Sequence, residues 1–160
     1  MSAHILITDR AYVLSLSQNG RYADLARLEG AAQCLLPAHL PLSEGLLEAA
    51  IEMAEDWLMP HATGLQGEVL EVTDTSGSLQ AGLESVLSSN TRQWTLEEIE
   101  QIFLRVVDWV TGGAVPASLQ AHRHFVAHVL LLREMAHLGR VSGVRLNQFE
   151  SPTSSKNDAS

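Results

Sequence analysis

The sequence predicts a mainly α-helical fold, a small helical bundle with an N-terminal αα-hairpin and at most one short β element. Three observations predict this fold. The segment 117–139 is the longest uninterrupted helical run, and its middle is apolar on almost every side, as in a buried helix. A capping box opens an amphipathic helix over 95–111. The segments 9–18 and 21–36 both carry apolar residues at helical spacing, and Asn19-Gly20 between them is a natural helix stop.

The length suits a single domain. At 160 residues the chain can bury a core without disulfide or metal staples. We expect one helical domain over 1–148. The last residues, 149–160, are polar and lack periodicity, so they are expected to form a disordered tail.

The charge balance limits the classes of partner. The chain has 10 Lys and Arg against 19 Asp and Glu, which gives a net charge of −9. Such a chain repels phosphate backbones and anionic membrane surfaces, so we expect no nucleic-acid or membrane partner, but another protein or a second copy of the chain. With one cysteine, Cys34, no disulfide can form within the chain. The apolar run around Leu130 is too short to span a membrane, and the expected location is cytoplasmic.

The N-terminal pair of predicted helices carries a weak repeat signal. Gly20, Tyr22, Ala32 and Pro37 are placed as in the second half of a tetratricopeptide repeat, and the segment resembles that motif. The resemblance implies a helical hairpin of the kind found in repeat-type peptide binders. It covers less than one repeat, and Glu29 stands where an aromatic residue is usual.

The middle of the chain predicts further helices and one strand. Ser43 can cap a helix that ends near Met59-Pro60, and Ser78 can cap a short helix to about residue 88. The best strand candidate is 64–73, and residues 4–7 can form a second short strand or precede a helix. The core is expected to contain Leu25, Leu47, Ile51, Trp57, Ile99, Phe103, Val106, Phe125, Val129 and Leu132.

Histidines on the 117–139 helix are the candidate metal ligands. His124 and His128 are four residues apart and therefore share one face of a helix. Glu134 and His137 have the Glu-x-x-His spacing of di-iron carboxylate helices, but no second copy of that motif follows. Iron, zinc or haem is the cofactor that these four residues could bind. The simpler interpretation is that His124 or His128 is a core histidine bonded to a neighbouring helix.

Other chemistry finds little support in the sequence. No Gly-x-Ser-x-Gly elbow and no glycine-rich nucleotide loop is present, and the single lysine, Lys156, lies in the polar tail. The segment Asp74-Thr75-Ser76 could bind a cation or a phosphate, although a plain turn is the simpler interpretation. No catalytic residue is assigned.

The function predicted from these observations is that of a non-enzymatic protein-binding adaptor, or an assembly or secretion chaperone. The chain is small, acidic and helical by pattern, and it lacks a complete catalytic constellation. The alternative is a helical metal- or haem-binding protein that uses the histidines of 117–139. A third possibility is a subunit with no activity outside its complex. Fold class alone does not decide between these functions.

Overall fold

The protein is built around a six-stranded mixed β-sheet. The computed structural model describes residues 2–87, 90–112 and 122–147. The strands follow the order β3-β2-β1-β4-β6-β5 across the sheet. Their bounds are Ser2–Ile7 for β1, Ala11–Gln18 for β2, Arg21–Glu29 for β3, Val69–Asp74 for β4, Gln93–Trp94 for β5 and Gly143–Leu146 for β6.

The strand directions bring the carboxyl ends of three strands to the same edge of the sheet. β1 pairs in parallel with β4, and β4 pairs in parallel with β6, so the carboxyl ends of these strands lie together. We call this end of the sheet, marked by Ile7, Asp74 and Leu146, the carboxyl rim. β2 is antiparallel to β1 and β5 is antiparallel to β6, so both of these strands begin at the carboxyl rim.

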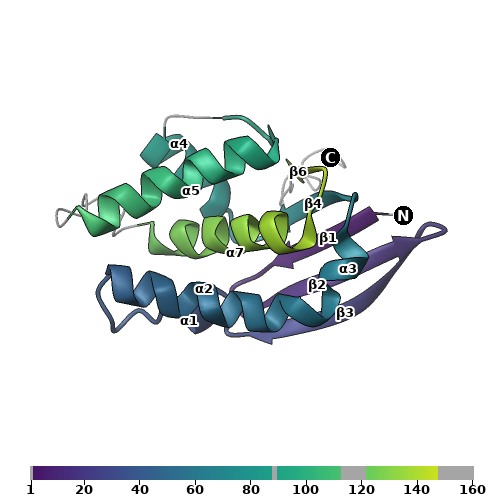
Figure 1. The fold of residues 1–160 in the computed structure, drawn as a ribbon, viewed down its shortest axis with the longest axis horizontal. Helices are drawn as coiled ribbons and strands as arrows, with labels where there is room; N and C mark the ends of the chain where they lie inside the picture. The colour runs from purple at the N-terminus through teal and green to yellow at the C-terminus, as the bar shows by residue number, and fades with distance from the viewer. Residues whose placement is uncertain (1, 88–89, 113–121, 148–160) are drawn as a thin grey trace, which may run out of the picture.

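One face of the sheet carries the helical layer. Along β1 and β4, burial alternates strictly, with every second side chain fully buried, which shows that the helices cover one face. Figure 1 looks onto the helices, with the strands behind them. The helices are α1 (Ala32–Leu35), α2 (Glu44–Leu58), a 3-10 turn (Met59–His61), α3 (Ala62–Leu65), α4 (Ser78–Leu87), α5 (Leu96–Thr111) and α7 (Arg123–Gly139).

Helix α7 is the centre of the helical layer, as the sequence predicted. Every residue from Phe125 to Leu132 is buried, and α7 packs against α2, α3, α4 and α5. Two small residues allow this close packing. A side chain at Gly82 of α4 would collide with Phe125, and one at Gly139 would collide with Leu65 of α3.

The predicted fold class, a mainly α bundle with an N-terminal αα-hairpin, is wrong. The segments 9–18 and 21–36 form the β2–β3 hairpin and α1 instead. Asn19 and Gly20 have φ angles of 53° and 79°, which is the left-handed pair that a two-residue hairpin turn requires. The same dipeptide can end a helix. Residues 11–15 of β2 are buried on both faces, so the alternation that identifies a strand is lost.

The repeat resemblance fails for the same reason. Tyr22, read as a packed residue of a helical repeat, lies on β3 with 54% of its surface exposed. Ala32 begins α1, which has only 4 residues. Leu25, expected in the core, is 38% exposed at the β-bulge of the same strand.

Several local predictions are confirmed. Ser43 caps α2 by accepting a hydrogen bond from Leu46 N, and Thr95 and Glu98 form the predicted capping box of α5. Residues 4–7 lie in β1, and β4 covers the second half of the predicted 64–73 strand. β5 and β6 were not predicted, because strands of 2 and 4 residues carry no detectable period. The predicted tail, 149–160, lies outside the described residues.

No helix among the described residues has both the length and the apolar character needed to cross a membrane.

Candidate functional site

A pocket opens at the carboxyl rim of the sheet. It has a volume of ≈ 510 Å³ and lies at the carboxyl ends of the parallel strands β4 and β6, beside the start of α4. In open sheets with parallel strands, ligands bind outside the carboxyl ends of the strands. The lining residues are Asp74, Thr75, Ser76, Gly77, Gln80, Ala81, Glu84, Arg92, Leu146 and Asn147.

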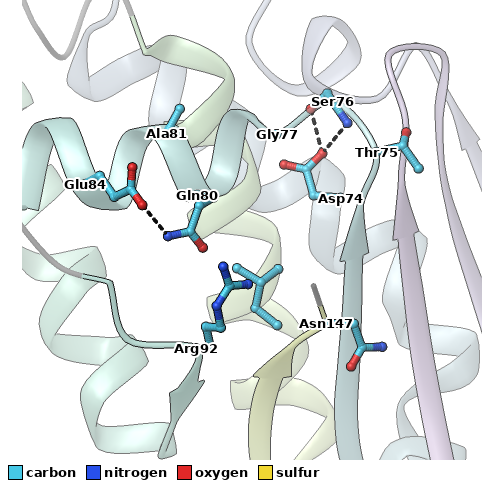
Figure 2. Close-up of a pocket in the computed structure, with 10 residues that line it drawn as sticks. Asp74, Thr75, Ser76, Gly77, Gln80, Ala81, Glu84, Arg92 and Asn147 are labelled. Atoms are coloured by element: carbon cyan, nitrogen blue, oxygen red, sulfur yellow. Dashed lines mark hydrogen bonds between the residues drawn. The ribbon is translucent and has the colours of Figure 1, made fainter. Parts of the chain in front are cut away.

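Asp74 fixes the turn between β4 and α4. Its side chain is buried, and one carboxylate oxygen accepts hydrogen bonds from Ser76 N at 2.9 Å and Ser76 Oγ at 2.6 Å (Figure 2). The other oxygen accepts from Leu79 N at 2.8 Å. This arrangement caps α4 and places a negative charge at the amino end of the helix, where the helix dipole stabilises it. Asp74 is therefore a rigid part of the pocket floor.

Hydrogen bonds from Thr75 join the pocket wall to the sheet, and one within α4 orients Glu84. Thr75 donates its N–H at 2.9 Å and its hydroxyl at 3.1 Å to the carbonyl oxygen of Ile7, which joins the ends of β4 and β1. On α4, Gln80 Nε2 donates to Glu84 Oε1 at 2.9 Å (Figure 2). The buried Gln80 Oε1 has no hydrogen-bond partner among the described residues. A hydrogen-bond acceptor at the pocket wall thus remains open to a ligand or water.

Arg92 supplies the positive charge of the pocket. Its carbonyl oxygen accepts a 2.7 Å hydrogen bond from Leu146 N, so its backbone is fixed beside the end of β6. Its side chain is exposed, and within the described part of the chain no carboxylate forms an ion pair with it. In Figure 2 the guanidinium points toward Gln80 of α4. A guanidinium with free N–H groups is suited to carboxylate or phosphate oxygens.

Asn147 connects the rim to the face of the sheet that carries no helix. Its N–H donates to the carbonyl of Val72 at 2.7 Å, and its Nδ2 donates to Thr73 Oγ1 at 3.4 Å. Thr73 Oγ1 is also 2.9 Å from Nε2 of His4. Partial burial lowers the pKa of His4 below its ordinary value, and the Glu71 carboxylate opposes this shift. His4 is therefore mainly neutral at pH 7.

Tyr12, in the same row across the sheet as Asp74, forms a buried polar pair with His128 of α7. Tyr12 is the register partner of Ile7, and Ile7 is the register partner of Asp74, so the three residues form a row across β2, β1 and β4. The Tyr12 hydroxyl is 2.9 Å from Nδ1 of His128 on α7. Burial raises the pKa of Tyr12 well above its ordinary value, with the charges of Asp74 and Cys34 acting in the same direction.

The four predicted metal ligands are not gathered into one cluster. The rings of His124 and His128 are 6.4 Å apart, and His128 is bonded to Tyr12, as the core-histidine interpretation expected. The buried Glu134 accepts a 2.6 Å hydrogen bond from Arg133, and His137 is exposed. In the described ranges, no three His, Cys, Asp or Glu side chains come close enough to hold a metal ion.

The charge states of these residues follow from their surroundings. Burial lowers the pKa of His128 to about 4, while the Asp74 charge raises it and His124 lowers it further. Burial raises the pKa of Glu134, and the hydrogen bond and charge of Arg133 oppose that shift. His128 is therefore neutral at pH 7.

Comparison with known proteins identifies the fold. No family model and no curated protein matches the sequence. Among solved structures, a Ppx/GppA phosphatase of Aquifex aeolicus superimposes with a TM-score of 0.61 at 7% identity, over 92% of this chain and 54% of that one. An exopolyphosphatase of Cytophaga hutchinsonii gives a TM-score of 0.62 at 10% identity, over 94% of this chain and 54% of that one. The chain has a Ppx/GppA phosphatase-like fold. It spans about half the length of these structures.

The Ppx/GppA-like fold corrects the predicted function. The adaptor or chaperone prediction rested on a helical bundle with a repeat-like hairpin, and both features are wrong. The alternative, a helical metal- or haem-binding protein, required the same helical fold and a ligand cluster that the described residues do not form. The structures that share this fold are named as phosphatases, which are enzymes.

The sequence located one part of the pocket and missed the rest. Asp74-Thr75-Ser76 was predicted to be a plain turn, with cation or phosphate binding as the alternative, and these residues line the pocket. Glu84 carried a detectable signal, because it follows Gln80 by one helical turn on the predicted 78–88 helix. Arg92 and Asn147 carried none, since they approach Asp74 only through the pairing of β4, β6 and β5.

Proposed function

We propose that this chain is a phosphate-binding domain of a phosphatase, and that the carboxyl-rim pocket holds a phosphoryl group of the substrate. The observation that carries the proposal is the position of Arg92. An exposed guanidinium without a described acidic partner faces the pocket at the carboxyl ends of the parallel strands. The names of the similar structures, a phosphatase and an exopolyphosphatase, supply the reaction class.

Arg92 is suited to the role by geometry and by charge. A guanidinium forms two parallel hydrogen bonds to phosphate oxygens and stays charged at any physiological pH. The hydroxyls of Thr75 and Ser76 lie on the same rim, but each already donates its proton, to the carbonyl of Ile7 and to Asp74, so the proposed role rests on Arg92. The net charge of −9 does not prevent a phosphate from binding, because at physiological ionic strength salt screens exposed charges that lie more than about 8 Å away.

Asp74 and Glu84 favour a phosphate that is accompanied by a divalent cation. Both carboxylates line the pocket and would repel a bare phosphate. Mg²⁺ is commonly held by one or two carboxylates together with substrate phosphates. Asp74 already accepts three hydrogen bonds, so Glu84 is the carboxylate with free acceptor capacity.

Glu84 is the residue that we assign as general base. It is exposed to the pocket, and Gln80 holds one of its oxygens. In the proposed hydrolysis a water oxygen bonds to phosphorus, the bridging P–O bond breaks, and the water proton passes to Glu84. The leaving phosphate oxygen takes a proton from solvent. A positioned base of this kind contributes roughly 10²–10⁴ to the rate.

Calorimetric titration of the full chain with sodium pyrophosphate in magnesium buffer tests the binding role. We expect saturable binding, and Arg92→Gln should weaken it about tenfold, because a hydrogen bond to a charged group contributes about 1.5–3 kcal/mol. Arg21→Gln is the matched control. It makes the same charge change at an exposed residue that begins β3, at the opposite end of the sheet.

Two results would contradict the binding role: no binding at millimolar pyrophosphate, or equal loss in Arg92→Gln and Arg21→Gln. The catalytic role is tested separately by phosphate release. At saturating pyrophosphate, Glu84→Gln should lower the rate of release by roughly 10²–10⁴-fold, the contribution of a positioned base. A Glu84→Gln protein that releases phosphate at the wild-type rate removes Glu84 from the mechanism.

A further inference from the structure

Strand β3 forms one border of the sheet, and its outer edge pairs with no other strand among the described residues (Figure 1). The strand is long for a border position, with 9 residues from Arg21 to Glu29, and none of them is buried. Tyr22 and Leu25 expose 54% and 38% of their surface. A border strand of this kind presents N–H and C=O groups that can pair with another strand.

The pairing of β3 with β2 shows which backbone groups of the second half of β3 point outward. Gly30 N donates a 2.7 Å hydrogen bond to the carbonyl oxygen of Arg10. In an antiparallel hairpin, hydrogen-bonded pairs alternate with pairs that exchange no hydrogen bond. The N–H and C=O groups of Glu29 and Arg27 therefore point away from β2.

The first half of β3 follows the same rule from the other end. The two-residue turn before the strand makes Arg21 a hydrogen-bonded partner of β2, so the groups of Tyr22 and Asp24 point outward. The β-bulge leaves Leu25 unpaired between the two halves. The outer edge thus has four positions for pairing: Tyr22, Asp24, Arg27 and Glu29.

An identical strand fits this edge in the antiparallel direction. In one register Tyr22 lies opposite Glu29 of the second copy, and Asp24 lies opposite Arg27 of the second copy. Each outward position then faces another outward position, so all of them form hydrogen-bonded pairs. The two-fold axis passes through the bulge, which interrupts neither half. Such a contact uses the same surface on both chains and closes at two copies.

The same register matches charges across the interface. Asp24 and Arg27 are the partners of Ser15 and Val13, on the face of the sheet that carries no helix. Ser15 donates a 3.0 Å hydrogen bond to Asp24, and in the described ranges no basic side chain forms an ion pair with Asp24. In the two-fold register each Asp24 faces an Arg27. Opposite charges at directly facing positions stabilise a sheet, and like charges destabilise it.

The other face of β3 is matched by apolar side chains. Ala23 lies opposite Leu28 of the second copy, and Leu25 lies opposite Ala26 of the second copy. Ala23 and Leu25 are exposed in the single chain, so pairing removes apolar surface from water. Border strands are often protected by proline or lysine, and β3 contains neither.

We propose that the outer edge of β3 binds a second copy of this chain, in the antiparallel register that sets Asp24 against Arg27. The two sheets then join into one continuous sheet. This interface is independent of the proposed phosphate-binding function, because β3 contributes no residue to the carboxyl-rim pocket. The net charge of −9 on each chain opposes association, but physiological salt screens exposed charges that lie more than about 8 Å apart.

Sedimentation velocity of the full chain, from micromolar to millimolar concentration, measures the association. We expect an equilibrium between monomer and dimer. Asp24→Arg and Arg27→Asp should each weaken it about tenfold or more, because the two-fold axis turns both ion pairs into repulsive contacts. A chain with both substitutions should recover the dimer, since opposite charges face each other again. Asp108→Arg, at an exposed residue of α5, which packs beside β5 at the other border of the sheet, is the matched control and should change nothing.

Amide hydrogen exchange of the wild type gives a readout that needs no variant. The N–H groups of Tyr22, Asp24, Arg27 and Glu29 should exchange more slowly as the protein concentration rises. A chain that stays monomeric at millimolar concentration overturns the proposal and leaves this edge to a strand of a different protein. The proposal also fails if a dimer forms without protection of these amides, or if the folded double variant associates as weakly as the single ones.

Discussion

The hydroxyl of Tyr12 on β2 lies 2.9 Å from Nδ1 of His128 on α7, and both side chains are fully enclosed. The bond joins β2, the strand next to β1, to the central helix α7. Tyr12 lies in the same row across the sheet as Ile7 of β1 and Asp74 of β4. The other ring nitrogen, Nε2, has no hydrogen-bond partner among the described residues. A buried histidine in this setting stays neutral, because protonation would place an uncompensated charge in the core.

This pair makes stability depend on pH. The pKa of His128 is about 4 in the folded protein, below the ordinary value of 6.5, so the unfolded chain binds the proton more tightly. The associated stability is complete above pH 6.5 and is lost as the pH falls toward 4. Between pH 7 and pH 5 the free energy of unfolding should fall by about 2 kcal/mol more in the wild type than in His128→Gln. Urea unfolding at both values measures this difference, and equal falls would show that His128 is not the titrating group.

Removing the hydroxyl of Tyr12 should destabilise the protein. Tyr12→Phe leaves Nδ1 of His128 without its partner inside the core, at a cost of about 1–3 kcal/mol. Tyr22→Phe is the control. Its hydroxyl also donates a hydrogen bond, to Glu71 at 3.3 Å, but the side chain is 54% exposed, so water replaces the lost bond. Chemical denaturation should therefore separate the two variants, and similar midpoints would refute the role given to the buried bond.

The contact between α4 and α7 requires glycine at position 82. A Cβ atom there would lie 2.2 Å from Cγ of Phe125, which is fully buried. We expect Gly82→Ala to cost about 3 kcal/mol or more through overpacking. Gly45→Ala, in α2, meets no atom within 4 Å and should be neutral or stabilising by up to about 1 kcal/mol. Thermal melting of both variants measures the contrast, and a stable Gly82→Ala protein would mean that α4 and α7 are further apart.

Arg133 neutralises a buried carboxylate. The Glu134 side chain is 1% exposed and accepts a 2.6 Å hydrogen bond from Arg133, which also pairs with Glu100 at 2.9 Å. Arg133→Met should cost about 3 kcal/mol at pH 7, because it leaves the Glu134 charge uncompensated. The pKa of Glu134 is already raised by burial, so the cost should shrink at lower pH. Adding Glu134→Gln should recover most of the loss, and strictly additive costs would show that the two side chains do not interact.

The sequence predicted the helices well because their signals are local. The Ser43 cap of α2, the capping box of α5 and the apolar run of α7 depend on residues within one or two turns of each other. The β2–β3 hairpin failed because β2 is buried on both faces, so Val13 and Leu14 break the alternation of an exposed strand. Asn19-Gly20 was consistent with both a helix stop and a hairpin turn, and only the pairing of β2 with β1 decides between them.

The site was harder to predict because pairing assembles it. Asp74 follows a predicted strand and precedes a predicted helix, and that local order predicts the turn in which it lies. Arg92 reaches the same pocket because its carbonyl bonds to Leu146 N, across more than fifty residues of sequence. No periodic pattern encodes such a contact, and β5 and β6 are too short to be detected individually.

The place of β6 in the sheet has a consequence for biosynthesis. β6 lies between β4 and β5, so it is the strand that holds Arg92 next to Asp74. Chains are made from the amino terminus and emerge from the ribosome in that order. A nascent chain that has not yet exposed residues 143–146 has β1 to β4 available for pairing, but β5 has no neighbour. The pocket is therefore complete only once residues 143–147 have emerged and paired with β4.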